Sequence, residues 1–349
     1  MAPWNDLTVL QFDTLAAIAR GDFVEAYDKR AQFEIILNRL LPSLTRAFLP
    51  VVFVVNRELS QLAIKADAQL AERGDKTGKL EDAARLVNRA FSICANDREM
   101  VRSQSRKWGV YFLAGLLFQL YFRLKTRNLC SSVTNTLQTT DLPPLEKFPL
   151  AHQIKYRYYQ GLLDFYRGDL LVAEAHLLFA FTSCPAKAQS NKERILWHLI
   201  PAAMHRAALP STALLDRFPR VRALFQPFCT ALRTGNVHLF DQGLVNHERL
   251  LLKQGTYLAL EETRIIALRT LLKKTYLVCG KSSRLPFQNF LKALELAGLD
   301  VEMCEAECLM ASMISKGLVK GYLSHERSIF VLSNMNPFPE LKKVDLSNA

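Results

Sequence analysis

Residues 285–332, LPFQNFLKALELAGLDVEMCEAECLMASMISKGLVKGYLSHERSIFVL, decide the fold of this 349-residue chain. The apolar spacing after Pro286, a residue suited to a first helical turn, predicts a helix that a glycine ends. A second helix is predicted over residues 304–316, and a glycine also follows it. Two runs rich in β-branched and aromatic residues then flank the polar corner 325–327, which predicts a β-hairpin. Helix, helix and hairpin in this order predict a winged helix.

The second of these helices indicates what the winged helix does. In a DNA reader of this architecture it enters the major groove and carries Arg, Lys, Asn or Gln on its outer face. Phosphate would repel two carboxylates at its leading end. We therefore expect a joint between protein subunits and not a major-groove reader. The positions outside the predicted apolar face are Glu305, Glu307, Ser312, Ser315 and Lys316.

Almost all of the chain before residue 285 has helical periodicity, and a short turn signature recurs in it. Gly-Asp or Gly-Asn stands at 21–22, 168–169 and 235–236. Glycine ends one helix in the left-handed conformation, and the Asp or Asn side chain caps the next. Such divergent helical hairpins predict a mainly α, tetratricopeptide-like solenoid whose surface binds other chains.

The predicted organisation has four parts. Helical repeats occupy residues 1–145 and end in a proline-rich linker; a second helical part covers 146–284, the winged helix 285–341 and a tail 342–349. Within the first part, residues 97–124 are expected to form one helix. Its uncharged run 108–122 is shorter than the roughly 20 residues needed to cross a bilayer, so we interpret it as a buried core helix.

Composition and charge limit the classes of function. Half of the residues are hydrophobic, which is typical of a globular chain, and the net charge is +12. That charge favours an acidic partner or a nucleic-acid backbone, although a generally basic surface could also serve solubility alone. The seven cysteines are scattered and no signal-peptide pattern opens the chain, so we expect reduced thiols in the nucleus or cytosol.

No motif in the sequence predicts catalysis. Cys304 and Cys308 have the spacing of one helix face but lack further ligands for a zinc site, and Cys308 is expected to be a small core residue. The histidines lie singly on separate helices, and neither a nucleophile elbow nor a dinucleotide-binding glycine pattern occurs. We expect no enzyme, no metal site and no cofactor.

Basic residues are the remaining functional signal. If they converge they would make a phosphate-binding surface without sequence preference, whereas each one alone fits a solvated face equally well. On the predicted hairpin, Tyr322 and Phe330 are expected to be exposed apolar residues of a partner interface. The candidate nucleic-acid-binding residues are Arg269, Lys273, Lys274, Lys320, His325, Arg327, Lys187, Lys192 and Arg194.

Several ordered segments of the chain resemble one family of proteins. The similarity runs from about residue 4 to residue 341 and keeps the order and approximate spacing of the segments. The chain resembles the PCI domain-containing protein two family, whose members carry a further N-terminal stretch without counterpart here. The matching segments are 22–27 (DFVEAY), 105–109 (SRKWG), 155–159 (KYRYY), 189–195 (QSNKERI), 319–325 (VKGYLSH) and 336–339 (NPFP).

The resemblance implies a non-enzymatic subunit of a nuclear transcription-coupled mRNA export complex at the nuclear pore. It implies pairing with a GANP-type PCI scaffold and with a small, acidic, disordered subunit shared with the proteasome lid. The joined winged helices would bind RNA or DNA, with Lys320 and His325 on that surface, and the loop 187–194 would contact nucleic acid or the acidic subunit. Two alternatives stay open: a signalosome-subunit-like paralogue with another PCI partner in transcription elongation or splicing, and a pure protein scaffold.

Overall fold

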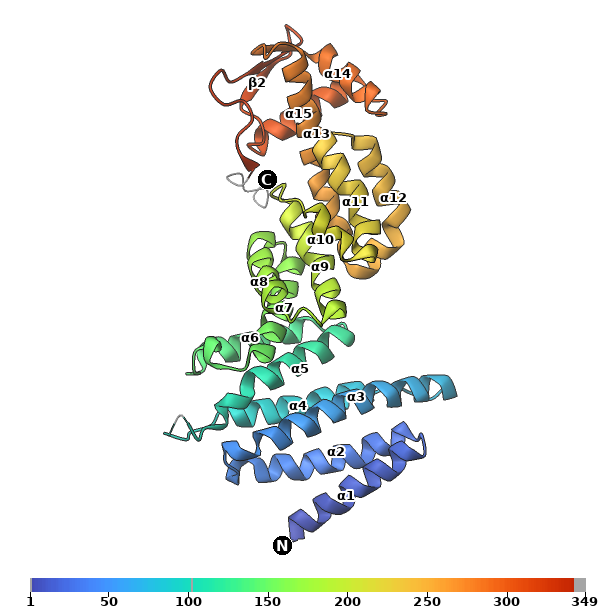
Figure 1. Cartoon of the computed structure of the whole chain (residues 1–349), viewed down its shortest axis with the longest axis vertical. Helices are drawn as coiled ribbons and strands as arrows, with labels where there is room; N and C mark the ends of the chain where they lie inside the picture. The colour runs from blue at the N-terminus through green and yellow to red at the C-terminus, as the bar shows by residue number, and fades with distance from the viewer. Residues whose placement is uncertain (1, 102, 342–349) are drawn as a thin grey trace. The chain divides into compact units, whose positions relative to one another are not determined.

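The computed structural model describes residues 2–101 and 103–341 (Figure 1). The chain forms two compact units, Met1–Tyr159 and Gln160–Ala349, and each is described by itself. The predicted tail 342–349 lies outside the described residues. The predicted fold class is confirmed, because both units are built of helical hairpins and a small winged helix closes the second.

The first unit is a stack of antiparallel helices, in which each of the first five packs on the next in sequence order. Short 3₁₀ turns join α2 to α3 and lead into α5. The last helix, α7, crosses the boundary between the two units. The helices are α1 (Ala2–Ala19), α2 (Phe23–Leu40), α3 (Leu49–Arg73), α4 (Lys79–Ala95), α5 (Val110–Arg123), α6 (Asn128–Thr139) and α7 (Leu150–Arg167).

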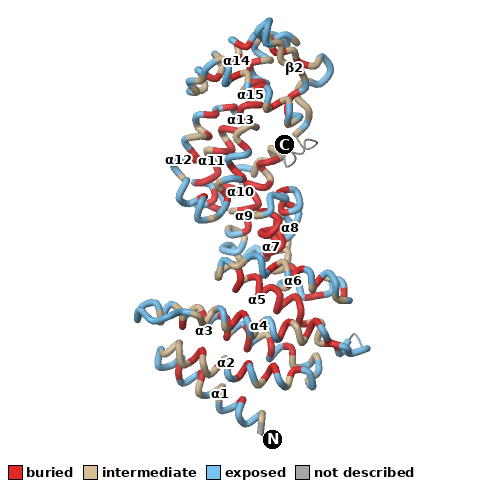
Figure 2. The backbone as a smooth tube through the Cα atoms, turned by 180° about the vertical axis from the view of Figure 1, so that it is seen from behind, coloured by how far each residue is buried: buried red, intermediate tan, exposed pale blue. Residues whose placement is uncertain are grey.

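Helix α5 is the buried core helix that its apolar sequence predicts. Nearly all of its residues are buried, as Figure 2 shows by its red tube. One stretch that includes α3, Arg46–Arg73, has the length and apolar composition of a membrane span, and 44% of its most apolar window is buried. Because α3 packs against α2, α4 and α5, we interpret it as a core helix of the unit.

The prediction of one helix over residues 97–124 is wrong at its start. Asp97 accepts hydrogen bonds from the Ser105 hydroxyl (2.9 Å), from the Arg106 backbone N–H (2.7 Å) and from the Arg106 guanidinium. Burial acts to raise the pKa of Asp97, but these hydrogen bonds outweigh it and lower the pKa to about 2. A carboxylate held by groups eight and nine residues away closes a loop, so the helix begins only at Val110.

The second unit is also built of packed helices, and it carries the winged helix. Its core joins Phe165, Leu170, Ala173, Ala202 and Ala259. Helix α13 packs on α9, α11 and α12 and then on the first helix of the winged helix. The helices before the winged helix are α8 (Leu170–Ser183), α9 (Gln189–Met204), α10 (Thr212–Asp216), α11 (Pro219–Thr234), α12 (Val237–Gln254) and α13 (Tyr257–Val278).

The recurring glycine turns have the predicted backbone. Gly21, Gly168 and Gly235 all take positive φ, at 76°, 90° and 74°. The side chains of Asp22 and Asn236 accept hydrogen bonds from Glu25 N and Leu239 N and so cap α2 and α12. The predicted side-chain cap is not present at the Gly168 turn, where Asp169 caps α8 by its backbone alone.

The winged helix consists of two helices and a three-stranded antiparallel sheet. Helix α14 (Phe287–Leu296) and helix α15 (Met303–Ser315) precede the hairpin of β2 (Gly321–Ser324) and β3 (Ile329–Leu332). The sequence did not predict the short strand β1 (Arg284–Pro286), which pairs with β3 and makes the strand order β1-β3-β2.

Candidate nucleic-acid and partner interface

The sheet of the winged helix has one buried and one exposed face. Leu285 of β1 pairs with Phe330 of β3, and Phe330 pairs with Leu323 of β2, so these three side chains point to the same side. Phe330 is 0% exposed and packs in the core of the winged helix. The prediction of Phe330 as an exposed interface residue is therefore wrong, whereas Tyr322, on the opposite face, is 63% exposed.

Helix α15 presents carboxylates to the surface, as its sequence predicts. Glu302 and Glu305 form a reciprocal capping box at its start. His325 at the tip of the hairpin lies 2.8 Å from Glu307 and ties the wing to α15. Because a carboxylate already holds the imidazole, His325 is a weaker candidate for phosphate than the other wing residues.

Cys304 and Cys308 are both exposed on α15, so the expectation that Cys308 is a core residue is wrong. The residues that face the core from this helix are Ala306, Met310 and Met313. Within residues 2–101 and 103–341, no three His, Cys, Asp or Glu side chains come together in a way that could hold a metal ion.

Three of the predicted cationic residues are exposed around the winged helix. Lys320 and Arg327 lie at the two ends of the hairpin, and Lys273 lies on the exposed side of α13. Lys274 is exposed as well, but its ammonium donates a 2.6 Å hydrogen bond to the Thr234 carbonyl. Lys320 and Arg327 are thus exposed cations of the hairpin, whereas α15 begins with the carboxylates of Glu302 and Glu305.

Arg269 has a structural role that its sequence position does not suggest. Its side chain is 7% exposed, and its guanidinium donates to the carbonyls of Leu318 (2.8 Å) and Pro339. Phe338 packs against the same guanidinium at 5.7 Å and against Tyr276. Arg269 therefore clamps the winged helix and the segment after β3 onto α13, and its guanidinium does not lie on the exposed surface that its prediction as a nucleic-acid-binding residue requires.

Replacing Arg269 by methionine is expected to lower the free energy of unfolding by about 2–4 kcal/mol, because two buried carbonyls lose their charged donor. The measurement is urea unfolding of the full chain. Lys273→Met on the exposed side of the same helix is the control and should change stability by less than about 0.5 kcal/mol. If Arg269→Met leaves the stability unchanged and weakens binding to RNA, Arg269 binds phosphate and is not a structural clamp.

The predicted basic loop 187–194 belongs to other elements than the winged helix. It runs from the turn between α8 and α9 into α9, where Lys192 and Arg194 lie, so the loop prediction is wrong from Gln189 onward; α11–α13 lie between these helices and the winged helix in Figure 1. Lys187 and Arg194 are exposed. The Lys192 ammonium donates to the Phe181 carbonyl (3.1 Å) and lies 4.7 Å from the Phe181 ring, so it holds the end of α8. The nine predicted residues therefore do not form one continuous surface.

Two exposed cations near the sheet were missing from the sequence prediction. Arg284 lies on β1, and Lys281 precedes that strand in a turn. A strand of three residues has no detectable periodicity, so Arg284 could not be placed on a face. The only signal in the sequence was that both residues lie just before the predicted start of the winged helix at residue 285.

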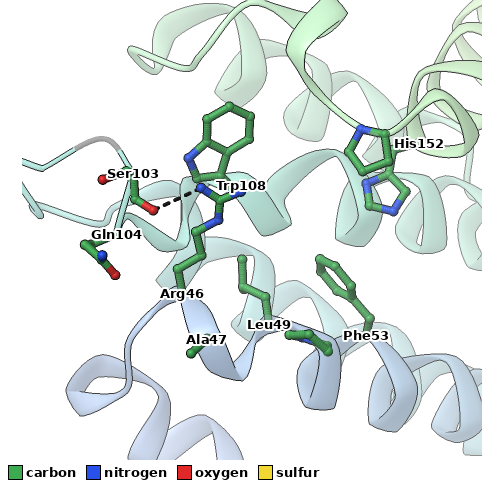
Figure 3. A pocket seen from close by; sticks show the side chains of 10 residues that line it. Arg46, Ala47, Leu49, Phe53, Ser103, Gln104, Trp108 and His152 are labelled. Atoms are coloured by element: carbon green, nitrogen blue, oxygen red, sulfur yellow. Dashed lines mark hydrogen bonds between the residues drawn. The ribbon is translucent and has the colours of Figure 1, made fainter.

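The first unit contains a pocket of about 440 Å³ beside the start of α3 (Figure 3). The Arg46 guanidinium lies 4.6 Å from the Trp108 ring and donates to the Ser103 carbonyl at 2.9 Å. Phe53 and His152 form another wall, and burial lowers the pKa of His152. His152 packs edge-on against the rings of Phe53 and Phe112, and the Arg46 guanidinium is engaged with a carbonyl, so we interpret both as packing residues of this pocket.

Comparison with known proteins supports the architecture. A family model described as PCI domain matches residues 244–334. A protein of Schizosaccharomyces pombe named Protein CSN12 homolog is 37% identical over 352 residues, covering 97% of this chain and 83% of that protein. PCI domain-containing protein 2 of Xenopus laevis is 32% identical over 350 residues, covering 98% and 86%. PCI domain-containing protein 2 homolog of Drosophila melanogaster is 32% identical over 323 residues, covering 91% and 80%.

The stacked helical hairpins and the winged helix that ends them define a PCI-domain protein. The likeness extends well beyond the PCI domain itself, over nearly the whole chain. This chain belongs to the family of PCI domain-containing protein 2 and the CSN12 homologs. The family predicted from the sequence is thereby confirmed.

Proposed function

We propose that the protein is a non-enzymatic subunit of a nuclear complex that couples transcription to mRNA export. The observation that carries the proposal is the distribution of charge on the winged helix. Lys320 and Arg327 are exposed on the hairpin and Lys273 is exposed on α13, whereas α15, the helix that would enter a DNA groove, begins with carboxylates. This arrangement suits a sequence-indifferent contact with phosphate next to a subunit joint.

The partners follow from the same family and from the charge of the chain. Membership in a PCI-domain family suggests a place in a multi-subunit complex, and we propose a GANP-type PCI scaffold as the neighbour at the winged helix. The net charge of +12 supports a second, acidic partner, for which we propose the small disordered subunit shared with the proteasome lid. The place of action in this proposal is the nucleus, at the nuclear pore.

Affinity purification of the tagged chain from its own cells, followed by mass spectrometry, tests the choice of partners. Recovery of a GANP-type scaffold together with the acidic subunit would agree with the proposal. The second candidate is a signalosome-subunit-like paralogue, and we propose that such a protein would act with another PCI partner in transcription elongation or splicing. Recovery of such a partner in place of the scaffold would move the assignment there.

The nucleic-acid part of the proposal is tested by reversing the charge of Lys273, Lys320 and Arg327 to glutamate. We expect the triple variant to bind a single-stranded RNA of about 20 nucleotides about 100-fold more weakly, and the slope of log K against log salt to fall by about 2. The measurement is fluorescence anisotropy of labelled RNA at several salt concentrations.

The control makes the same change of net charge in the first unit. Arg73, Lys76 and Arg89 are exposed there, and replacing all three by glutamate should weaken RNA binding by less than about threefold if contact is local. Equal losses in both triple variants would show that only the overall charge matters. If the wild-type protein binds no RNA, the remaining alternative is a protein scaffold without nucleic-acid contact.

A further inference from the structure

The exposed face of the winged-helix sheet has an unusual set of side chains. The register places Arg284, Val331 and Tyr322 in one row across the three strands, and Pro286, Ile329 and Ser324 in the next. Continuing the register through the hydrogen bonds from Leu332 N to Ser283 O and from Ser333 N to Lys320 O adds a third row. We call these three rows the outer sheet face; the third consists of Ser282, Ser333 and Lys320.

Burial confirms that this face is open. Tyr322 is 63% exposed, Arg284 and Lys320 are exposed, and Val331 between them is half-buried. The alternate residues Leu285 and Phe330 are 0% exposed on the other side. The phenol ring of Tyr322 therefore lies on a surface and not in the core, where tyrosine would contribute to stability.

The charge of the outer sheet face has one sign. Its rows contain an aromatic ring, two cations, three hydroxyl side chains and aliphatic residues, and no carboxylate. Glu302, Glu305 and Glu307 lie at the start of α15 or on it, where Glu307 also holds His325, and Glu326 lies at the tip of the hairpin. A polyanion is thus repelled from the helix that reads DNA in other winged helices and attracted to the sheet.

We propose that the outer sheet face binds single-stranded nucleic acid, with one base stacked on Tyr322 and neighbouring phosphates held by Arg284 and Lys320. The proposal rests on the proposed nucleic-acid binding of the winged helix and assigns it a position and a mode. Every base has a π-face, so stacking on a tyrosine is indifferent to sequence. Duplex bases are already stacked on each other and cannot use this face in the same way.

The spacing of Tyr322, Arg284 and Lys320 fits one continuous stretch of a nucleic-acid strand. Strands lie about 4.8 Å apart, so Tyr322 and Arg284, which flank β3, are about 10 Å apart. The long arginine side chain reaches from there toward the phosphate of the nucleotide next to the stacked base. Lys320 precedes Tyr322 by two positions on the same strand side, about 7 Å away, and offers a second phosphate contact.

A protein partner on this face is the competing occupant, and the side chains favour it less. Obligate interfaces have a continuous apolar centre from which charged residues are depleted. Here the cations Arg284 and Lys320 stand in the rows themselves, and Val331 and Ile329 are already half-buried. The combination of an open aromatic ring with cations only is the one that single-stranded nucleic-acid surfaces use.

The test compares two probes on the full chain by fluorescence anisotropy. One is a labelled oligouridine of about 12 nucleotides, and the other is an abasic ribose-phosphate strand of the same length. Tyr322→Ala is expected to bind oligouridine about tenfold more weakly than the wild type, and the abasic strand equally well. Tyr322→Phe keeps the ring and should keep the affinity. Because no charge changes, the salt dependence of both variants should match the wild type.

Leu296→Ala is the matched control, since Leu296 is 91% exposed on α14 of the same domain and lies off the sheet. It should leave both affinities unchanged. The urea midpoint of Tyr322→Ala should stay within experimental error of the wild type, because the side chain is exposed. A photo-cross-link from 5-bromouridine in the probe to the peptide that contains residues 321–324 provides a second measurement, independent of any variant.

The outcomes separate this inference from the function on which it rests. If the wild type binds neither probe, the proposed nucleic-acid binding fails and the inference fails with it. If the wild type binds oligouridine and Tyr322→Ala binds it as tightly, the stacking site is wrong while the proposed function survives. Unchanged RNA binding with loss of a co-purifying PCI scaffold in Tyr322→Ala would assign the outer sheet face to a protein.

Discussion

Replacing Gly235 by alanine is expected to lower the free energy of unfolding by about 3 kcal/mol. The loss has two causes: alanine is strained in the left-handed backbone conformation, and its Cβ overlaps with neighbouring atoms. The residue has a φ of +74° in the turn between α11 and α12. An added Cβ would lie 2.7 Å from Leu271 N and 2.9 Å from its Cα. These are backbone atoms of α13 and cannot rotate away, so the turn and α13 must separate.

Gly168→Ala is the control for the backbone part of this effect. Gly168 has a φ of +90° in the same kind of turn, but an added Cβ meets nothing within 4 Å there. Its replacement should cost only about 1 kcal/mol. Urea unfolding of both variants measures the difference, which isolates the contact between the α11–α12 turn and α13. Equal losses would mean that this turn moves off α13 without resistance.

The second large effect concerns Glu34, a carboxyl group in the core of the first unit. Glu34 is 0% exposed on α2, and Asn56 of α3 donates to it at 3.0 Å. Burial raises the pKa of Glu34 to about 8, and the hydrogen bonds from Asn56 and Asn38 and the charge of Arg30 offset burial only in part. The folded chain therefore holds a proton on Glu34 at neutral pH.

The direction of the resulting pH dependence follows from proton binding. Between the unfolded pKa of 4.5 and the folded pKa of about 8, the folded state binds more protons at Glu34 than the unfolded state. Stability from this group is therefore complete below pH 4.5 and falls as the pH rises through this window, by on the order of 4 kcal/mol. The Asp97 contribution is lost only below about pH 4 and does not overlap with measurements above pH 5.5.

Glu34→Gln should remove this loss, because glutamine stays neutral and keeps the size of the side chain. We expect the variant to exceed the wild type in urea midpoint by a small margin near pH 5.5 and by a larger margin at pH 8. Comparing the two proteins at each pH cancels the titration of the histidines. Glu25→Gln, a change of the exposed carboxylate on the same helix, should leave the pH profile intact. A parallel shift of both variants with pH would contradict a protonated Glu34.

Local patterns in the sequence were sufficient to predict the winged helix and the glycine turns. The spacing of Phe287, Phe290 and Leu294, and the glycines after both helices, depend on neighbours within a few residues. The hairpin was predicted for the same reason, from two β-rich runs about a polar corner. These elements keep their local preferences in the folded protein.

The errors occurred where distant partners decide a side chain's surroundings. Arg269 is buried because its guanidinium donates to two carbonyls, 49 and 70 residues further along the chain. Helical periodicity does not reveal either partner. A hairpin alone does not indicate which of its faces is covered, and the packing of α14 on β1 and of α15 on β2 decides that Phe330 is inside. The exposure of Arg284 depends on the unpredicted pairing of β1 with β3.

The Arg269 clamp also determines how a movement would be transmitted. Because Leu318 and Pro339 are both tied to α13, a rotation of this helix would carry the winged helix with it. The 22 residues of α13 span about 33 Å, so a rotation of about 10° at its first turn would displace the winged helix by roughly 6 Å. A protein bound far from the sheet, against the start of α13, would thereby re-aim Tyr322 without touching it.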